Sequence, residues 1–164
     1  MEIIIGIGEC VVSNNEKDIL KTFSLGSCVA LTMYSLREKV LGMVHIPLPA
    51  SVINSVNGKK KPGYYVDTAI PYLLDIMINK HDCKKNELIA NIFGGADSPK
   101  QKDFFKIGER NVKAVKSLLA QNFIFLQRED TGGAYSRNVE ADVATGTIKL
   151  GKLCLNELKR IPGN

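Results

Sequence analysis

Two short segments of the chain carry the side chains best suited to covalent chemistry. Residues 22–34 present Cys28 directly after a Gly-Ser pair, where a turn runs into an apolar, strand-forming stretch. Residues 42–49 then present His45, one of two histidines in the protein. A thiol and an imidazole are the minimum pair for nucleophilic attack on an acyl carbon. The pair therefore indicates a cysteine hydrolase, with Cys28 as nucleophile and His45 as base.

Residue types alone leave a plainer interpretation open for both side chains. A free cysteine often acts as a small buried hydrophobe. His45 lies between Val44 and Ile46, a setting that also suits a hydrogen-bonded core histidine. One cysteine with one distant histidine is a pattern of low specificity.

Strand patterns predict how the two residues meet. Residues 29–34 and 40–46 are rich in strand formers and are separated by a charged turn, which predicts a β-hairpin. Cys28 and His45 would then lie on neighbouring strands. The polar loop 50–63 follows that hairpin, and we interpret it as a flap facing the substrate.

The remaining pattern predicts an α+β fold. Apolar residues recur at helical spacing from residue 66 to 77, with Pro71 expected near the helix start, and again from 107 to 121. Residues 3–12 read as a strand interrupted by glycines, and 88–93 as a buried strand. Residues 124–155 predict an antiparallel meander. This order predicts helices packed outside layered, mixed β-sheets.

Composition sets the general class. The 164 residues are 45% hydrophobic and 24% charged, as in an ordinary globular protein, and we expect a single domain spanning 1–164. No apolar run is long enough to span a bilayer and no export signal is recognised, so we expect a cytoplasmic protein without membrane insertion. The four cysteines are then expected to be reduced.

Composition and spacing also argue against several partners. The net charge of +5 is scattered apart from a lysine run at 59–61 without interleaved aromatic residues, so nucleic-acid binding is not expected. His81-Asp82-Cys83 has no second cluster at zinc-ligand spacing. We expect no metal and no cofactor.

The wording around the two candidate residues resembles a known family. Leu25-Gly-Ser-Cys-Val-Ala30, followed by His45-Ile-Pro-Leu-Pro49, is similar to the chemoreceptor glutamine deamidase family CheD of bacterial chemotaxis. Further similar motifs follow in the expected order: Tyr65–Ile70, Ile92–Ala96, Ile107–Asn111, and Asp130–Gly133 with Arg137. The resemblance covers nearly the whole chain.

The resemblance implies a fold, a reaction and a third site residue. The fold would be a layered sandwich similar to cytotoxic-necrotizing-factor-like cysteine hydrolases. The reaction would be hydrolysis of glutamine side chains in methyl-accepting chemoreceptors to glutamate, through a thioester. The family places a threonine six positions before its cysteine to orient the histidine, which implies that role for Thr22.

The turn itself suggests how charge in the transition state is stabilised. Backbone amides of Gly26, Ser27 and Cys28 are the expected donors to an oxyanion, because glycine lets successive N–H groups converge. The Ser27 hydroxyl is either a helper or a small turn residue.

Two other functions stay open from the sequence. The family is known to engage CheC-type phosphatases, so the protein could act as a regulatory binding module with little catalysis. It could also be a general cysteine amidohydrolase acting on another amide. A redox sensor would need a resolving cysteine near Cys28, and the other three cysteines have structural settings.

Overall fold

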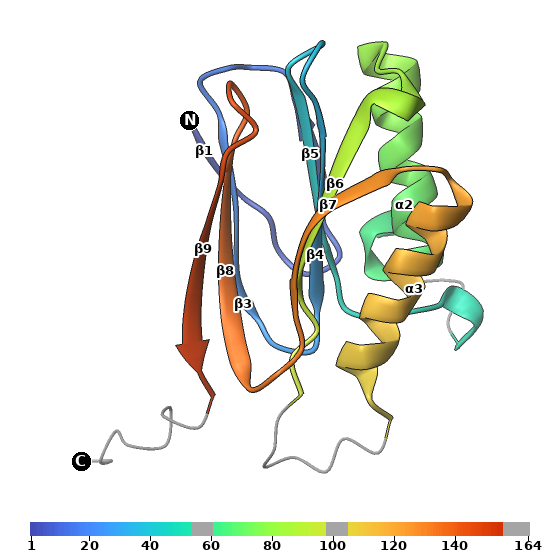
Figure 1. Cartoon of the computed structure of the whole chain (residues 1–164), viewed down its shortest axis with the longest axis vertical. Helices are drawn as coiled ribbons and strands as arrows, with labels where there is room; N and C mark the ends of the chain where they lie inside the picture. Colours follow the sequence, from blue (N-terminus) through green and yellow to red (C-terminus); the bar gives the residue numbers. More distant parts are fainter. Residues whose placement is uncertain (54–60, 98–104, 156–164) are drawn as a thin grey trace.

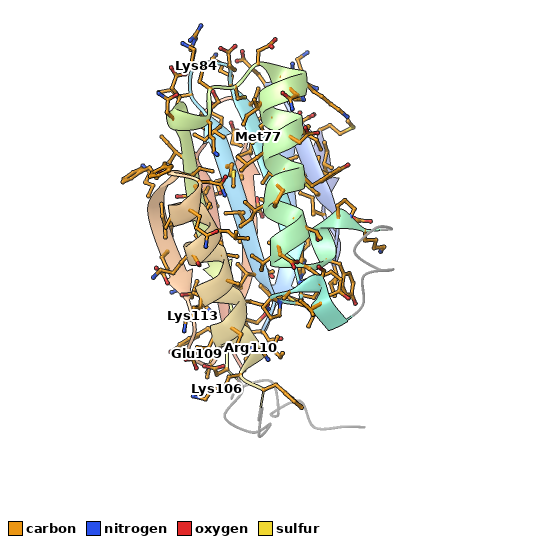
Figure 2. The ribbon with its side chains drawn as sticks, turned by 90° about the vertical axis from the view of Figure 1, so that its right-hand side faces the viewer. Met77, Lys84, Lys106, Glu109, Arg110 and Lys113 are labelled. Carbon is orange, nitrogen blue, oxygen red and sulfur yellow. The ribbon has the colours of Figure 1, made fainter. Side chains whose placement is uncertain are left out.

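The computed structural model describes residues 1–53, 61–97 and 105–155. These residues form three layers, namely a four-stranded sheet, a five-stranded sheet and a layer of helices (Figure 1). Turning the molecule by 90° shows that the two long helices lie on the outer face of the five-stranded sheet (Figure 2). The predicted α+β architecture with helices outside mixed sheets is confirmed.

The elements follow a simple arrangement. The first sheet contains, in spatial order, β1 (Glu2–Ile4), β3 (Ile19–Leu25), β8 (Tyr135–Asp142) and β9 (Ile148–Cys154). The second contains β2 (Cys10–Ser13), β5 (Val40–Ile46), β4 (Val29–Ser35), β6 (Leu88–Gly94) and β7 (Phe125–Thr131). The helical layer contains α2 (Val66–Asp75), a π-helical extension η3 (Ile76–Lys80) and α3 (Ile107–Gln121). Short 3-10 turns are η1 (Ser51–Ile53), η2 (Pro62–Tyr64) and η4 (Lys85–Glu87).

The five-stranded sheet supplies both hydrophobic cores. Every residue of its central strands β4 and β5 is buried, as expected for strands covered on both faces. Alternation along β4 sends Leu31 and Met33 toward the helices, and Ala30 and Tyr34 toward the first sheet. The predicted hairpin of β4 and β5 therefore lies at the centre of the molecule.

The helix α2 confirms the predicted apolar stripe but not the place of its proline. Val66, Ala69, Ile70, Leu73 and Leu74 are buried against the sheet. Pro71 was expected early in the helix, where backbone N–H groups are still free, yet it lies in the helix interior although the helix begins at Val66 as expected. Because proline has no N–H, it cannot donate to the carbonyl one turn earlier, and packing of the apolar face maintains the helix instead.

The predicted C-terminal antiparallel meander is wrong at its first connection, between β7 and β8. β7 pairs in parallel with β6, in the second sheet, and the chain then crosses to the first sheet as β8. Parallel neighbours need a long crossover, and α3 supplies it. The turn after Thr131 therefore marks a change of sheet, whereas β8 and β9 form the expected antiparallel pair.

The interrupted strand near the start of the chain is likewise divided between sheets. β1 pairs with β3 in the first sheet, and β2 pairs with β5 in the second. The residues between them carry the chain from one layer to the other, and Gly8 adopts a positive φ of 76° there.

We predict that Gly42→Ala destabilises the contact between β5 and α2. A Cβ at Gly42 would lie 2.5 Å from Leu73 Cδ1 and 3.2 Å from Met77 Sδ, so the helix must shift. Overpacking of this kind costs about 1–3 kcal/mol. Thermal unfolding of the variant should show a lower midpoint than wild type.

The matched control is Gly151→Ala on β9. Its added Cβ would come no closer than 3.7 Å to Asn138 Cβ. Equal unfolding midpoints for the two variants would contradict the packing argument.

Candidate active site

The candidate nucleophile lies on a turn that connects the two sheets. β3 ends at Leu25 in the first sheet and β4 begins at Val29 in the second, so residues 26–28 cross between them. This crossing lies at the same end of the molecule as the β7–β8 connection and the start of α3, the lower end in Figure 1. Cys28 is half-buried at this end.

A bulge in β3 places Thr22 in the interior. The register between β3 and β8 shifts between Thr22 and Leu25, where Phe23 and Ser24 are both exposed. Ser24 has a φ of 56°, and its N–H donates to Asn138 Oδ1 over 2.8 Å. The extra outward residue lets Thr22 and Leu25 both face inward, which is what a bulge does to alternation.

Thr22 orients the imidazole of His45 through a single hydroxyl. Thr22 Oγ1 lies 2.8 Å from the carbonyl oxygen of Ile5 and 2.8 Å from His45 Nδ1. The carbonyl can only accept, so the one hydroxyl proton goes to Ile5 and His45 Nδ1–H donates to Thr22. This is the arrangement in which both contacts are hydrogen bonds. The proton on Nδ1 leaves Nε2 with a free lone pair.

That lone pair is available as a base. His45 is 4% exposed, and its Nε2 has no hydrogen-bond partner among the described residues. His45 pairs directly with Ala30 across β4 and β5. Cys28 precedes Ala30 by two residues and packs against the same inter-sheet core, so it is the diagonal neighbour of His45. Diagonal positions on one face of an antiparallel pair are about 7–8 Å apart, so the two side chains belong to the same local region of this face.

Burial keeps both groups neutral in the resting protein. Desolvation raises the pKa of the Cys28 thiol above its ordinary value of 9.0, although its own backbone N–H partly opposes this by stabilising the thiolate. Desolvation also lowers the pKa of His45 below 6.5, against a smaller opposing effect of the Ile5 backbone. Both directions favour a thiol on Cys28 and a neutral imidazole on His45 at neutral pH.

Residues 26–28 form what we call the nucleophile turn, and each of their three carbonyl oxygens accepts a hydrogen bond. Ala96 N–H donates to Gly26 O and Gly95 N–H donates to Cys28 O, both over 2.8 Å. Asn111 Nδ2 donates to Ser27 O over 2.9 Å. A trans peptide points its N–H opposite to its C=O. The N–H groups of Ser27 and Cys28 therefore point away from this anchored side.

The turn has a tight inner side and an open outer side. A Cβ at Gly94, whose φ is 107°, would lie 2.2 Å from the carbonyl oxygen of Cys28, so only glycine fits. A Cβ at Gly26 would meet nothing within 4 Å. The structure thus leaves room for another molecule beside Gly26.

The chain corner after β7 supports the segment that anchors the turn. Arg137 is 3% exposed and its Nε donates to Asp130 Oδ1 over 2.9 Å, while Lys152 lies 2.6 Å from Asp130 Oδ2. Burial opposes ionisation of Asp130, but hydrogen bonds from Lys152 and Arg137 outweigh it and lower its pKa. Gly132 N–H donates in turn to Gly94 O. The motif at 130–137 therefore braces the site from outside it.

The structure brings together most of the predicted site and adds one residue. Thr22 and His45 are in direct contact, and the turn containing Gly26, Ser27 and Cys28 lies beside them. The sequence assigned no role to Asn111, although this residue is the last of the family-like motif Ile107–Asn111. The predicted flap lies partly in 54–60, outside the described residues.

Comparison with known proteins decides the family. A family model described as CheD chemotactic sensory transduction matches residues 47–152. The chain belongs to the CheD family. The matched segment begins after His45, so it includes none of Thr22, Cys28 and His45.

Individual CheD relatives match over nearly the whole chain. A protein of Syntrophotalea carbinolica named "Probable chemoreceptor glutamine deamidase CheD" is 39% identical over 91% of this chain and 93% of its own length. The "Chemoreceptor glutamine deamidase CheD" of Thermotoga maritima is 42% identical over 93% of each chain. A Pyrococcus abyssi relative, also named as a probable CheD deamidase, is 39% identical over 93% of this chain and 92% of its own length. The family resemblance seen in the motifs is confirmed.

The described residues were also compared with the requirements of a metal site and of a membrane-spanning helix. In residues 1–53, 61–97 and 105–155, no group of three His, Cys, Asp or Glu side chains gathers at metal-binding distance. No helix in the same ranges is both long and apolar enough to cross a membrane.

We predict that Thr22→Val lowers turnover and leaves the protein folded. Valine keeps the branched shape but removes the acceptor for Nδ1–H, so the imidazole loses its preferred tautomer and orientation. The expected fall in kcat is roughly tenfold to a hundredfold, less than for loss of the base itself. Two buried groups lose a partner, which costs about 1–3 kcal/mol of stability.

Thr22→Ser is the matched control, because it retains the hydroxyl. Turnover and thermal unfolding of both variants test the role. A Thr22→Val enzyme with wild-type kcat would remove Thr22 from the site, and so would a loss of activity explained entirely by unfolding.

We predict that pH separates this neutral pair from a preformed thiolate–imidazolium pair. His45 must be neutral to act as base, and its pKa is lowered, so kcat/KM should persist as pH falls to 6.5 and decline only below it. The thiol pKa is raised, so the rate of direct alkylation of Cys28 by iodoacetamide should be very low at neutral pH and should still be increasing at pH 9.0, without reaching a plateau.

Peptide mapping by mass spectrometry reads each cysteine separately, with half-buried Cys154 as internal reference. Rapid alkylation of Cys28 at pH 6, in the presence of slow alkylation of Cys154, would show that a thiolate already exists and would contradict the neutral pair.

Proposed function

We propose that this protein hydrolyses glutamine side chains of chemoreceptors to glutamate through a thioester on Cys28. The observation that carries the proposal is the hydrogen bond from His45 Nδ1–H to Thr22, which leaves Nε2 as a buried base without a hydrogen-bond partner among the described residues. The names of the CheD relatives supply the substrate class.

The first half-reaction forms the thioester. As Cys28 Sγ attacks the carboxamide carbon, His45 Nε2 takes the thiol proton and the C–S bond forms. The resulting imidazolium donates that proton to the amide nitrogen. The C–N bond then breaks and ammonia leaves. Thr22 accepts from Nδ1–H throughout and keeps the ring in one orientation.

The second half-reaction returns the enzyme to its starting state. A water molecule loses a proton to His45 Nε2 as its oxygen bonds to the thioester carbon. The C–S bond then breaks, glutamate forms, and the imidazolium returns the proton to the Cys28 sulfur. The neutral resting pair suits this cycle because the same imidazole acts as base and as acid in each half.

Both tetrahedral intermediates carry an oxyanion, and the turn offers donors for it. The N–H groups of Ser27 and Cys28 point away from their anchored carbonyls, and the Cα of Gly26 in the same turn has open space beside it. Because hydrogen bonds already hold the carbonyls, these amides need little reorganisation when charge develops. Loss of one such donor typically costs a hundredfold or more in rate.

We also propose that residues 1–164 work as one domain in the cytoplasm. Both hydrophobic cores share the five-stranded sheet, so neither layer forms independently of it. All four cysteines carry free thiols, as suits a reducing compartment. A CheC-type phosphatase remains a candidate partner, with no surface assigned to it, and the chain offers no nucleic-acid motif.

We predict that the wild-type protein releases ammonia from a chemoreceptor cytoplasmic fragment and that Cys28→Ala and His45→Ala do not. Each converted glutamine gains about one mass unit, which mass spectrometry of receptor peptides detects. Cys154→Ala is the matched control, since it removes a half-buried thiol of the edge strand β9, which pairs with β8 and not with β3 or β4, and should retain full activity.

Three outcomes separate the candidate functions. Deamidation by wild type and Cys154→Ala alone supports the proposal. Equal release of ammonia from small amides and from receptor favours a general amidohydrolase. Identical null results for wild type and Cys28→Ala, with both still binding a CheC-type phosphatase, would replace catalysis by a docking role.

A further inference from the structure

We propose that Asn111 is a positioning residue that sets the nucleophile turn against the end of the histidine strand. Its side-chain amide joins Ser27 and Pro47, which adjoin Cys28 and follow His45 respectively. This inference rests on the proposed function, because it assigns Asn111 a part in the same reaction.

The contacts of Asn111 reach two segments that are far apart in the sequence. Nδ2 donates to Ser27 O and to Pro47 O, each over 2.9 Å, and the side chain is 0% exposed. Asn111 itself belongs to the second turn of α3, in the helical layer. One amide group therefore links three elements at the site.

Each of the two bonds controls a group needed for attack. Ser27 C=O and Cys28 N–H belong to the same planar peptide, so a bond to the carbonyl sets the direction of the N–H. β5 ends at Ile46, and Pro47 has no N–H with which to continue the ladder. The bond to Pro47 O holds the end of the strand that presents His45.

The unpartnered amide oxygen of Asn111 indicates that this side chain does more than stabilise the fold. Asn111 Oδ1 is buried and has no hydrogen-bond partner among the described residues. An unsatisfied buried acceptor costs roughly 1–3 kcal/mol. A side chain selected only for packing would avoid this cost, so the two donated bonds are the property that asparagine contributes here.

The start of α3 packs closely against residues 95 and 96, so the position of Asn111 relative to the turn is fixed. A Cβ at Gly108 would lie 2.6 Å from Gly95 O and 2.7 Å from Ala96 O, so the helix backbone contacts the segment that anchors the turn. Gly95 and Ala96 in turn donate to Cys28 O and Gly26 O. Helix, anchoring segment and turn therefore form one contiguous unit with Asn111 across it.

We predict that Asn111→Leu lowers kcat roughly tenfold to a hundredfold while KM changes less than about twofold, as expected when reacting groups are misplaced but binding is not. Leucine keeps a similar volume and removes the unsatisfied oxygen, but it also leaves Ser27 O and Pro47 O without their donor, so the unfolding midpoint should fall below wild type while the protein stays folded. Asn111→Ala is the second variant in case leucine does not fit.

The matched control is Asn91→Leu. Asn91 is a buried asparagine of β6, 5% exposed, and its Nδ2 donates to Thr32 Oγ1 over 3.3 Å. It shares the burial of Asn111, but its hydrogen bond goes to Thr32 within β4 and not to residues 26–28 or to the end of β5. Asn91→Leu should keep wild-type kcat at whatever stability it shows.

The alkylation profile of Cys28 supplies a readout that does not need a receptor substrate. When the turn is released, the Cys28 N–H no longer stabilises the thiolate, so alkylation should shift to higher pH in Asn111→Leu and not in Asn91→Leu. An unchanged profile together with unchanged kcat would overturn the positioning role. A fall in activity that only tracks unfolding in both variants would also overturn it.

The same design separates this inference from the proposed function. If wild type does not deamidate receptor, the proposed function fails, while the alkylation profiles still test whether Asn111 positions Cys28. If wild type is active and the profiles of wild type and Asn111→Leu coincide, only the inference on Asn111 fails.

Discussion

Hydrogen bonds to three successive carbonyls of the nucleophile turn determine the geometry of the site. Gly26, Ser27 and Cys28 cross between two sheets, where no regular ladder can hold them, and donors from Ala96, Asn111 and Gly95 replace that ladder. Since each peptide is planar, anchoring a carbonyl also aims the N–H on its other side. The turn therefore has its amides oriented before any substrate arrives.

A second constraint fixes the tautomer of His45 through the single hydroxyl proton of Thr22. The Thr22 hydroxyl has a single hydrogen, which it donates to the Ile5 carbonyl. The imidazole must therefore carry a proton on Nδ1 in order to donate to Thr22. A carboxylate in the same place would favour the imidazolium, whereas a hydroxyl adds no charge. Burial of both groups reinforces neutrality. In the proposed mechanism, the proton therefore moves from the thiol to His45 during attack and not before it.

Sequence patterns predicted the parts of the fold whose signals are local. The β4–β5 hairpin, the apolar faces of α2 and α3, and the strand before Gly94 all follow from periodicity within one element. Which sheet a strand joins is a long-range property, and there the predictions failed. β7 pairs with β6 because α3 bridges a parallel crossover, a choice that the turn residues after Thr131 do not encode.

The residues able to do chemistry, their order and their family were determined by the sequence alone, because a thiol, an imidazole and a hydroxyl are recognisable as residue types within motifs. Their working relationship was decided by the tertiary structure. The tautomer of His45 depends on the carbonyl of Ile5, just after β1, and Asn111 contacts the site from the helical layer. Directional hydrogen bonds between distant segments exist only once the layers have packed, so no local pattern contains them.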